Sequence, residues 1–209
     1  MLASSLHTPA KRLLLMRHGQ AGDPASKRYI GRTDTGLTSL GRCQAAALAE
    51  LLSVAPLRRV VSSDLGRCLH TARAVAARHG LIVEADPGLG EIDLGEWENR
   101  TFEDVRRTEP EAFRRRGEDM AGFRPPGGES FADLRNRVVP RLEAIMADAS
   151  GCVAVVAHAG VNRVALCRWL GMPLADLFLL GQDPGCLNVL DFSPSGFKRL
   201  QALNFSPGG

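Results

Sequence analysis

The sequence predicts an α/β fold, a three-layer α/β/α sandwich around a mainly parallel central sheet. Two apolar runs, residues 13–16 and 153–157, have the unbroken hydrophobicity of strands that are buried on both faces. Amphipathic helical segments alternate with the predicted strands, and such alternation builds a parallel sheet that is covered on both sides. No segment of the 209 residues has the composition of an interdomain linker. We therefore expect a single domain over residues 1–209, with an ordered core over about residues 11–205.

Apolar periodicity and capping residues place the individual elements. Thr38 is suited to cap a helix at its N-terminus, Gly80 is suited to end the next helix, and a later long helix has to tolerate Pro140. In chain order, we expect strands at residues 13–16, 59–62, 82–84, 153–157, 187–192 and 199–203, and helices at residues 39–53, 67–79, 131–147 and 161–170.

Residues 86–130 interrupt this alternation, because their periodicity is weak. One or two short helices are expected between Thr101 and Arg116, followed by the helix-breaking sequence at residues 125–128. We interpret this segment as an insertion that covers the edge of the sheet.

Composition limits the kinds of partner. The net charge of +3 is modest and the basic residues are scattered, so small anions are expected as partners and nucleic acid is not. No segment is long and apolar enough to span a bilayer, which argues against a membrane partner. The five cysteines lack metal-binding or disulfide spacing, which is typical of a reducing compartment and predicts a cytoplasmic protein. The sequence does not specify the oligomeric state, and a homodimer is one alternative.

Two histidines follow directly after the buried strands. His18 stands in Arg17-His18-Gly19, and His158 stands in His158-Ala159-Gly160. The carboxyl ends of parallel strands meet at one edge of an open α/β sheet, where such sheets bind their ligands. We therefore expect both rings in one pocket.

The cationic groups predicted near these histidines suit a phosphate ester. A neutral imidazole can attack phosphorus and carry the phosphoryl group covalently, while the phosphate oxygens need several cationic or amide donors. Arg17 supplies one guanidinium, and Arg67, in the first turn of a predicted helix, supplies a second. His158 would add an N–H, and the backbone amides that begin the following helix at Ala159 would add more.

The leaving oxygen of such an ester needs a proton. Glu91 follows the third predicted strand toward the same edge and is the candidate general acid. Asp93, Glu96 and Glu98 lie close to it in the sequence, so spacing alone leaves these carboxylates as alternatives.

In order and spacing, these motifs resemble the histidine phosphatase superfamily, also called phosphoglycerate mutase-like. The resemblance extends over about residues 11–191. It rests on the segments Leu15-Met16-Arg17-His18-Gly19-Gln20, Gly31-Arg32-Thr33-Asp34-Thr35-Gly36-Leu37-Thr38, Ser62-Ser63-Asp64-Leu65-Gly66-Arg67-Cys68, residues 91–98, Pro126-Gly127-Gly128-Glu129-Ser130 and Ala157-His158-Ala159-Gly160-Val161-Asn162-Arg163.

The resemblance implies a phosphoglycerate mutase-like fold and a phosphomonoesterase that works through a phosphohistidine, without metal or other cofactor. His18 would be the phosphorylated nucleophile, and Glu91 would donate the proton to the leaving group. Arg17, Arg67 and His158 would form the phosphate pocket. Within the matching motifs, the further predicted phosphate contacts are Gly19, Arg32 and Ala159.

The resemblance also favours one branch of the superfamily. The segment after Trp97-Glu98 is short and lacks the long basic insertion with which the mutase branch holds phosphoglycerate, so hydrolysis is favoured. Residues 185–191 and the short acidic segment look most like the α-ribazole phosphatase branch, which makes α-ribazole 5'-phosphate a candidate substrate. One departure is Asp23-Pro24, which stands where many members carry an asparagine that contacts phosphate.

Other functions stay open at the level of the sequence. A mutase-type phosphotransferase would use the same nucleophile, and a catalytically silent module would bind a phosphorylated ligand without turnover. A metal hydrolase with His18 and His158 as ligands is disfavoured, because no carboxylate partner lies nearby in the sequence and Arg17 would repel a cation.

Overall fold

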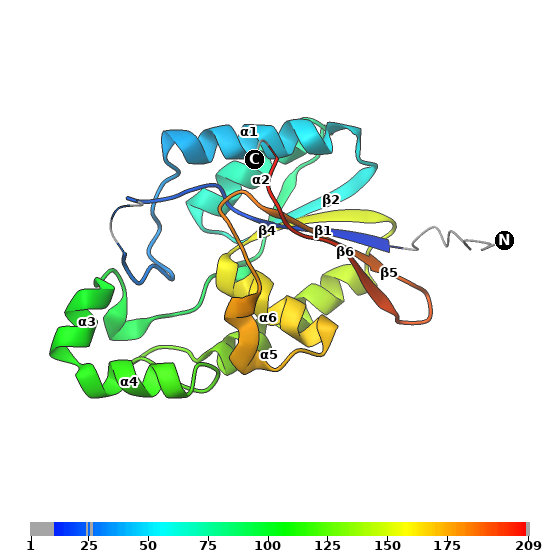
Figure 1. Ribbon diagram of the computed structural model, residues 1–209. Helices are drawn as coiled ribbons and strands as arrows, with labels where there is room; N and C mark the ends of the chain where they lie inside the picture. The colour runs from blue at the N-terminus through cyan, green and yellow to red at the C-terminus, as the bar shows by residue number, and fades with distance from the viewer. Residues whose placement is uncertain (1–10, 24, 26, 208–209) are drawn as a thin grey trace.

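A computed structural model describes residues 11–23, 25 and 27–207 (Figure 1). Its centre is a six-stranded sheet with the strand order β3-β2-β4-β1-β5-β6. The strands are β1 (Lys11–Arg17), β2 (Leu57–Ser62), β3 (Val83–Ala85), β4 (Cys152–Ala157), β5 (Leu187–Phe192) and β6 (Lys198–Phe205). The pairings among β3, β2, β4 and β1 are parallel, whereas β5 and β6 join as antiparallel strands.

Helices cover both faces of this sheet, so the predicted three-layer sandwich is confirmed. The helices α1 (Ser39–Leu51) and α2 (Gly66–Ala77) lie above the sheet in Figure 1, and α5 (Phe131–Ala147) and α6 (Ala159–Leu170) lie below it. The mainly parallel character of the sheet is confirmed as well. Each pair of parallel strands is connected through a helix, as parallel pairing requires.

Local sequence explains where the helices begin. The Thr38 hydroxyl accepts a hydrogen bond from the amide of Gly41 and caps α1 as predicted. Ser130 and Asp133 form a capping box at the start of α5, in which each side chain accepts from the other residue's amide. Pro140 lies inside α5, as expected from the amphipathic pattern that continues on both sides of it.

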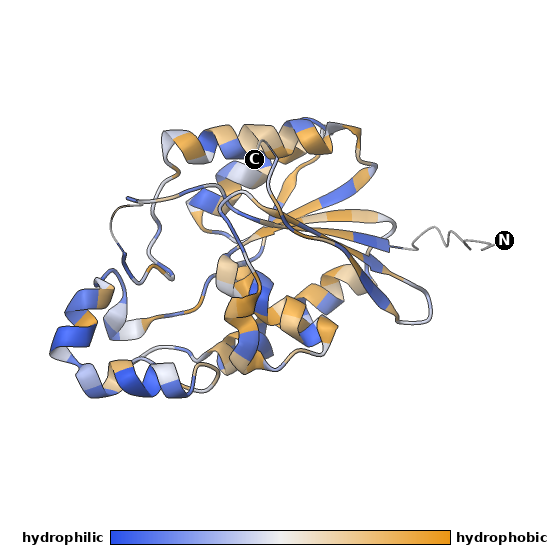
Figure 2. Cartoon of the chain, in the orientation of Figure 1, coloured by the Kyte–Doolittle hydropathy of each residue, from blue (hydrophilic) through white to orange (hydrophobic). Residues whose placement is uncertain are grey.

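The alternation of side chains along β1 divides the core into two layers. Leu13 and Leu15 pack into the cluster formed with α5 and α6, and Leu14 and Met16 pack into the cluster formed with α1 and α2. All four are buried because the strand is central and covered on both sides. Figure 2 shows the same pattern as hydrophobic colouring through the middle strands.

Residues 86–130 lie to the side of the sandwich, at the lower left in Figure 1, and contain α3 (Phe102–Thr108) and α4 (Pro110–Glu118). Both helices are largely hydrophilic (Figure 2), and no residue of α4 is buried. Trp97 fixes this segment to the body of the protein: its indole is fully buried, lies beside Tyr29 and Phe123, and donates to the carboxylate of Glu109.

Several boundaries differ from the predicted ones. β1 begins at Lys11 because its backbone pairing with β5 continues past the apolar run. A 3-10 helix over Leu174–Leu179, η4, was not predicted, since its apolar residues follow no helical period. α6 begins at Ala159, two residues earlier than expected, directly after the strand that carries His158.

The five cysteines are free thiols. Cys68, Cys152, Cys167 and Cys186 are buried free thiols, while Cys43 is exposed. Within residues 11–207, apart from the two positions that are not described, no helix is long and apolar enough to cross a membrane.

Because Leu15 is buried in the central strand, replacing it tests the packing of this core directly. Leu15→Ala removes a fully buried side chain from a packed layer, and we expect it to lower the free energy of unfolding by about 2–5 kcal/mol. Leu179→Ala, at a leucine that is 77% exposed, is the matched control and should change it by less than about 0.5 kcal/mol. Urea unfolding measures both, and equal losses would contradict the layer arrangement.

Candidate active site

The parallel pairing of β1 with β4 brings the two histidines together. Arg17 and Ala157, the last residues of the two strands, are partners in the register, and the amide of His18 donates to the carbonyl of Ala157 at 3.1 Å. His18 and His158 follow at the same edge of the sheet, with ring centroids 5.2 Å apart in an edge-on arrangement. The two rings therefore meet at one edge of the sheet as expected, but only His18 lines the cavity there, because His158 is fully buried.

His18 is oriented by its own neighbour. Its Nδ1 lies 2.7 Å from the carbonyl oxygen of Gly19, which can only accept, so Nδ1 carries the proton and Nε2 carries the lone pair. Burial and the positive charges of Arg17 and Arg67 hold the pKa of His18 well below its ordinary value. The ring is therefore neutral at neutral pH, with an unprotonated nitrogen available as a nucleophile.

Arg67 is a buried guanidinium at the first turn of α2. It donates to the carbonyls of Thr33 and Gly31 at 2.7 and 2.6 Å, and its Nε lies 3.3 Å from Nε2 of His18. Asp34 lies 3.9 Å away and also accepts from the amide of Gly66. The predicted cation is thus beside the predicted nucleophile, held there by the loop that contains the second motif.

His158 is fully buried behind these two residues. Its Nδ1 lies 3.3 Å from Nη2 of Arg67, which can only donate, so the ring proton is on Nε2 and points to the hydroxyl of Ser63 at 2.9 Å. Burial and the neighbouring His18 and Arg67 hold the pKa of His158 well below its ordinary value. In this structure His158 supports Arg67, and its direct contact with phosphate stays a prediction.

Arg17 lies beside His18 and lines the cavity. Its Nη1 donates to the carbonyl of Gln182 at 2.6 Å, and its Nε is buried without a hydrogen-bond partner among the described residues. Gln182 is itself held by the side-chain amides of Asn162 and Asn188, at 2.9 and 2.8 Å. A buried amide network therefore fixes the direction of this guanidinium.

Glu91 is the carboxylate that reaches the cavity. It is buried, it lines the same cavity as His18, and its two oxygens accept from the amides of Ile92 and Gly160 at 2.9 and 3.0 Å. A Cβ at Gly160 would lie 2.4 Å from one of these oxygens, so only glycine allows this approach. The helix that follows His158 thus binds the carboxylate that the sequence proposed as general acid.

The three competing carboxylates have other contacts. Glu98 accepts from the amides of Gly31 and Thr33, the two residues whose carbonyls hold Arg67. Asp93 accepts from the amide of Gly95, and Glu96 is exposed. None of the three is among the residues that line the cavity, so the geometry distinguishes Glu91 where spacing did not.

The other residues predicted to contact phosphate, Gly19, Arg32 and Ala159, do not line the cavity. Arg32 is exposed, lies 3.6 Å from the carboxylates of Asp93 and Glu129, and does not line the cavity. The amide of Gly19 donates to the hydroxyl of Thr71, and Ala159 is the half-buried first residue of α6. Of the departure at Asp23-Pro24, Asp23 lines the cavity and Pro24 lies outside the described residues.

The cavity has a volume of about 580 Å³ and a polar lining. It is lined by Arg17, His18, Gln20, Ala21, Gly22, Asp23, Arg28, Ile30, Thr35, Arg67, Glu91, Asn99 and Pro184. His18, the buried carboxylate of Glu91 and the side chains of three arginines, Arg17, Arg28 and Arg67, share it. In the part of the chain that the structure describes, no group of three or more His, Cys, Asp or Glu side chains is arranged to hold a metal ion.

Comparison with known proteins decides the family. The model of the histidine phosphatase superfamily (branch 1) matches residues 13–205. The chain belongs to this superfamily. The predicted family is therefore confirmed, and so is the prediction that the chain is a phosphomonoester hydrolase, since its named relatives in the superfamily are phosphatases.

This histidine phosphatase resembles two groups of relatives to similar degrees. It is 34% identical to adenosylcobalamin/alpha-ribazole phosphatase of Salmonella typhimurium, over 92% of this chain and 96% of the relative. It is 37% identical to glucosyl-3-phosphoglycerate phosphatase of Mycolicibacterium vanbaalenii, over 82% and 79% of the two chains. Identity alone does not separate these two substrates.

Solved structures show the same two groups. The alpha-ribazole phosphatase of Shigella flexneri superimposes with a TM-score of 0.84 at 31% identity, covering 93% of this chain and 96% of that one. A mycobacterial glucosyl-3-phosphoglycerate phosphatase in complex with VO3 gives a TM-score of 0.84 at 34% identity, covering 94% and 100%. The fold of this histidine phosphatase is therefore shared along nearly its whole length.

Sequence reasoning missed the residues that hold the predicted site in place. Gln182, Glu98 and Arg137 each bind a segment that carries a predicted site residue, through the contacts at Arg17, at the loop around Gly31 and at the backbone of Glu91. In each of these contacts one partner is a backbone group and the other is a side chain distant in the sequence. No spacing or periodicity signals such a contact, and only the fold reveals it.

The lowered pKa values of His18 and His158 predict an acid-sensitive fold. Both rings resist protonation when folded, whereas in the unfolded chain they bind protons below about pH 6.5. The contribution of these neutral rings to the free energy of unfolding is fully present above that pH. As the pH falls from about 6.5 to 5, the free energy of unfolding should decrease by up to about 1.4 kcal/mol per pH unit for each histidine.

Urea unfolding at several pH values measures this slope. His18→Gln removes one of the two groups and should make the dependence shallower in the same window, while His70→Gln, at an exposed histidine, is the control. An identical slope in the His18→Gln and unmodified proteins would show that His18 is not the group responsible.

Proposed function

We propose that this chain is a metal-independent phosphomonoesterase that transfers the phosphoryl group of a small metabolite to Nε2 of His18 and then to water. The observation that carries the proposal is the orientation of His18, whose Nδ1 proton is held by Gly19 so that a neutral Nε2 is left in a cavity with Arg17, Arg67 and Glu91. Nucleophile, charge stabilisers and proton donor then surround one phosphate.

In the first step, Nε2 of His18 attacks phosphorus in line with the ester oxygen. The N–P bond forms as the P–O bond breaks, and the protonated carboxyl group of Glu91 gives its proton to the leaving oxygen. The products of this step are the alcohol, a phosphohistidine and the carboxylate of Glu91. The buried amides of Ile92 and Gly160 hold that carboxylate in place.

In the second step, water attacks phosphorus and the N–P bond breaks. The carboxylate of Glu91 takes one proton from the water, and the remaining hydroxyl group stays on the released phosphate. His18 is again neutral, and Glu91 is again protonated. The cycle therefore closes with water as the acceptor of the phosphoryl group.

Charge on the transferring phosphoryl group is balanced by the two arginines. Arg67 is almost completely buried, where a guanidinium acts more strongly on an oxyanion than in water. Arg17 has a buried Nε that finds no partner within the part of the chain that the structure describes, and an oxygen of a bound phosphate would supply one. The complexes of a similar mycobacterial phosphatase with VO3 and with inorganic phosphate support an oxyanion site of this kind.

The covering segment favours hydrolysis over mutase chemistry. Several of its arginines pair with carboxylates nearby, among them Arg100 with Asp104 and Glu109, and Arg114 with Glu111 and Glu118. Such pairs reduce the positive charge that could hold a second acidic group of a phosphoglycerate. Water is then the expected acceptor of the phosphoryl group.

As the substrate, we propose a small phosphate monoester with a polar leaving group, and α-ribazole 5'-phosphate as the first compound to examine. The cavity is larger than a phosphate group needs, and beyond the nucleophile Gln20, Arg28 and Asn99 offer polar groups to the leaving alcohol. The similarity to α-ribazole phosphatases over nearly the full length of both chains supports this choice. Glucosyl-3-phosphoglycerate is the alternative that the other group of relatives suggests.

Replacing the nucleophile tests the proposed chemistry. We expect His18→Ala to abolish both phosphate release from p-nitrophenyl phosphate, assayed with a chelator present, and acid-labile ³²P labelling of the protein. His70→Ala, at an exposed histidine, should behave like the unmodified protein. Turnover near the unmodified level in His18→Ala would exclude the phosphohistidine route, and loss of activity in chelator would exclude metal independence.

Replacing the buried cation tests charge stabilisation. Arg67→Ala should cost about 2 to 4 kcal/mol of transition-state stabilisation, seen as a loss in kcat, the size expected for a single oxyanion donor. Arg73→Ala, at an exposed arginine of the same helix, should leave kcat unchanged. A rise in KM with kcat intact would mean that Arg67 binds the ground state only.

A substrate panel separates the remaining functions. The panel holds α-ribazole 5'-phosphate, glucosyl-3-phosphoglycerate, sugar and nucleotide monophosphates, and 3-phosphoglycerate with 2,3-bisphosphoglycerate. We expect phosphate release, with the highest kcat/KM for α-ribazole 5'-phosphate. Transfer between positions of phosphoglycerate would indicate a mutase, and phosphate binding without any turnover would indicate a silent binding module.

A further inference from the structure

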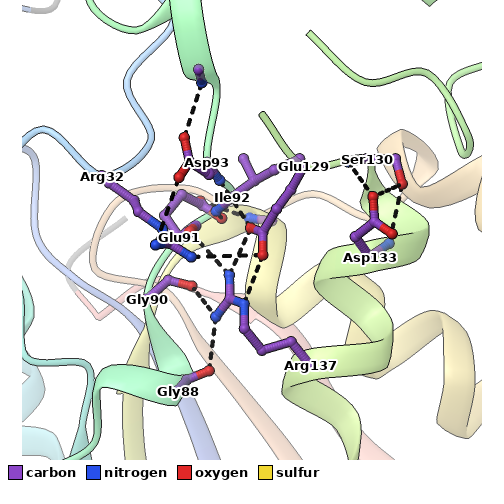
Figure 3. A network of polar contacts seen from close by, with 12 residues as sticks. Arg32, Gly88, Gly90, Glu91, Ile92, Asp93, Glu129, Ser130, Asp133 and Arg137 are labelled. Atoms are coloured by element: carbon purple, nitrogen blue, oxygen red, sulfur yellow. Dashed lines mark hydrogen bonds and ion pairs between the residues drawn. The ribbon is translucent and has the colours of Figure 1, made fainter. Parts of the chain in front are cut away.

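Arg137, on the inner side of α5, is bound through every N–H group of its guanidinium (Figure 3). Its Nη1 donates to the carbonyls of Gly88 and Gly90 at 2.9 and 3.1 Å, and its Nη2 donates to the carbonyl of Glu91 at 3.3 Å. The remaining donors, on Nε and Nη2, each lie 2.9 Å from an oxygen of Glu129. All five donors that an arginine has are thereby used.

Glu129 extends this contact to the other side of Glu91. Its Oε2 also accepts from the amide of Asp93 at 3.0 Å, and its own amide donates to the carbonyl of Asp93 at 2.8 Å. Burial acts to raise the pKa of Glu129, but the hydrogen bonds from Arg137 and from the Asp93 amide lower it overall. Glu129 is therefore an anion that joins helix α5 to the segment that carries Glu91.

We propose that Arg137, together with Glu129, is a positioning residue for the proton transfer by Glu91. The pair holds the backbone at residues 88, 90, 91 and 93, on both sides of the carboxyl group, while its own side chains stay out of the cavity. This inference rests on the proposed function, since it assumes that Glu91 is the general acid.

The geometry around Glu91 leaves little room for displacement. One carboxylate oxygen is bound by the next amide in the chain, and the other by the amide of Gly160 on a different element. The second contact forms only while residues 88–93 stay against the start of α6, where a Cβ at Gly160 would already collide with the carboxylate. A shift of about 1 Å in such a site reduces rates by about 100-fold.

Arginine is needed at this position because of its shape. The planar guanidinium donates to the Glu129 carboxylate with one edge and to three carbonyls with the rest. A lysine has three donors on one atom and cannot span these acceptors. Arg137→Lys therefore keeps the positive charge but cannot contact the Glu129 carboxylate and the three carbonyls at the same time.

The dependence of the rate on the leaving group is a readout that a purely structural role would not change. A p-nitrophenolate leaves without protonation, whereas an alkoxide needs the proton of Glu91. We use kcat/KM, which covers the steps up to formation of phosphohistidine. For Arg137→Lys, we expect kcat/KM to fall about 10- to 100-fold with an alkyl phosphate such as glycerol phosphate, and less than about threefold with p-nitrophenyl phosphate.

Three further variants complete the experiment. Glu91→Gln should show the same selectivity in a larger form, because it removes the proton donor itself. Glu129→Gln should resemble Arg137→Lys and replaces it if the lysine variant does not fold. Arg141→Gln, one turn later on α5, breaks only the exposed pair with Asp86 and should leave both rates unchanged.

The outcomes separate the two claims. Selective loss with alkyl phosphate in Arg137→Lys and Glu91→Gln supports the positioning role. Equal loss with both substrates in Arg137→Lys, or no loss, overturns that role while a selective Glu91→Gln leaves the proposed function intact. An equal fall in kcat/KM for the two substrates in Glu91→Gln, or no fall, would overturn Glu91 as the general acid, and the inference about Arg137 with it.

Discussion

The parallel hydrogen-bond ladder between β1 and β4 is the constraint on which the site depends. The ladder runs from Arg12 and Cys152 to Arg17 and Ala157, and the next amide, that of His18, still donates to Ala157. A shift of one residue in this register would turn every side chain of β1 to the opposite layer of the core. The packing of leucines and valines in two layers therefore also fixes where the two imidazoles meet.

A buried positive charge has to be held by acceptors, and the site is arranged around this need. Arg67 is surrounded by backbone carbonyls of the loop at residues 31–33, which Glu98 orders through the amides of the same residues. Removing a partner from a buried guanidinium is costly, so the loop and the cation stabilise each other. The resulting charge, together with burial, keeps His18 neutral and thus nucleophilic.

Glu91, the proposed proton donor, belongs to a different part of the structure from His18, the proposed nucleophile. His18 and Arg17 come from the sheet, whereas Glu91 stands on an irregular segment with no ladder of its own to hold it. It is held by Arg137 of α5, by Glu129 just before that helix and by the amide of Gly160 in α6. The contacts that hold His18 and those that hold Glu91 are therefore separate, and for this reason we expect variants to separate the two proposed steps.

The sequence by itself determined the layers and the strands that carry the histidines, and it predicted His18 and Arg67 as site residues, because apolar periodicity and strand-end position are local properties. It could not choose among Glu91, Asp93, Glu96 and Glu98, since all four lie on one short segment. Only the tertiary structure shows that Glu91 is the one of the four that lines the cavity with His18, that His158 contacts Arg67, and that Arg137 contacts Glu91 and Gln182 contacts Arg17. All of these contacts join groups that are far apart in the sequence. Those of Arg137 and Gln182 also involve backbone groups, which are the same at every position of a sequence.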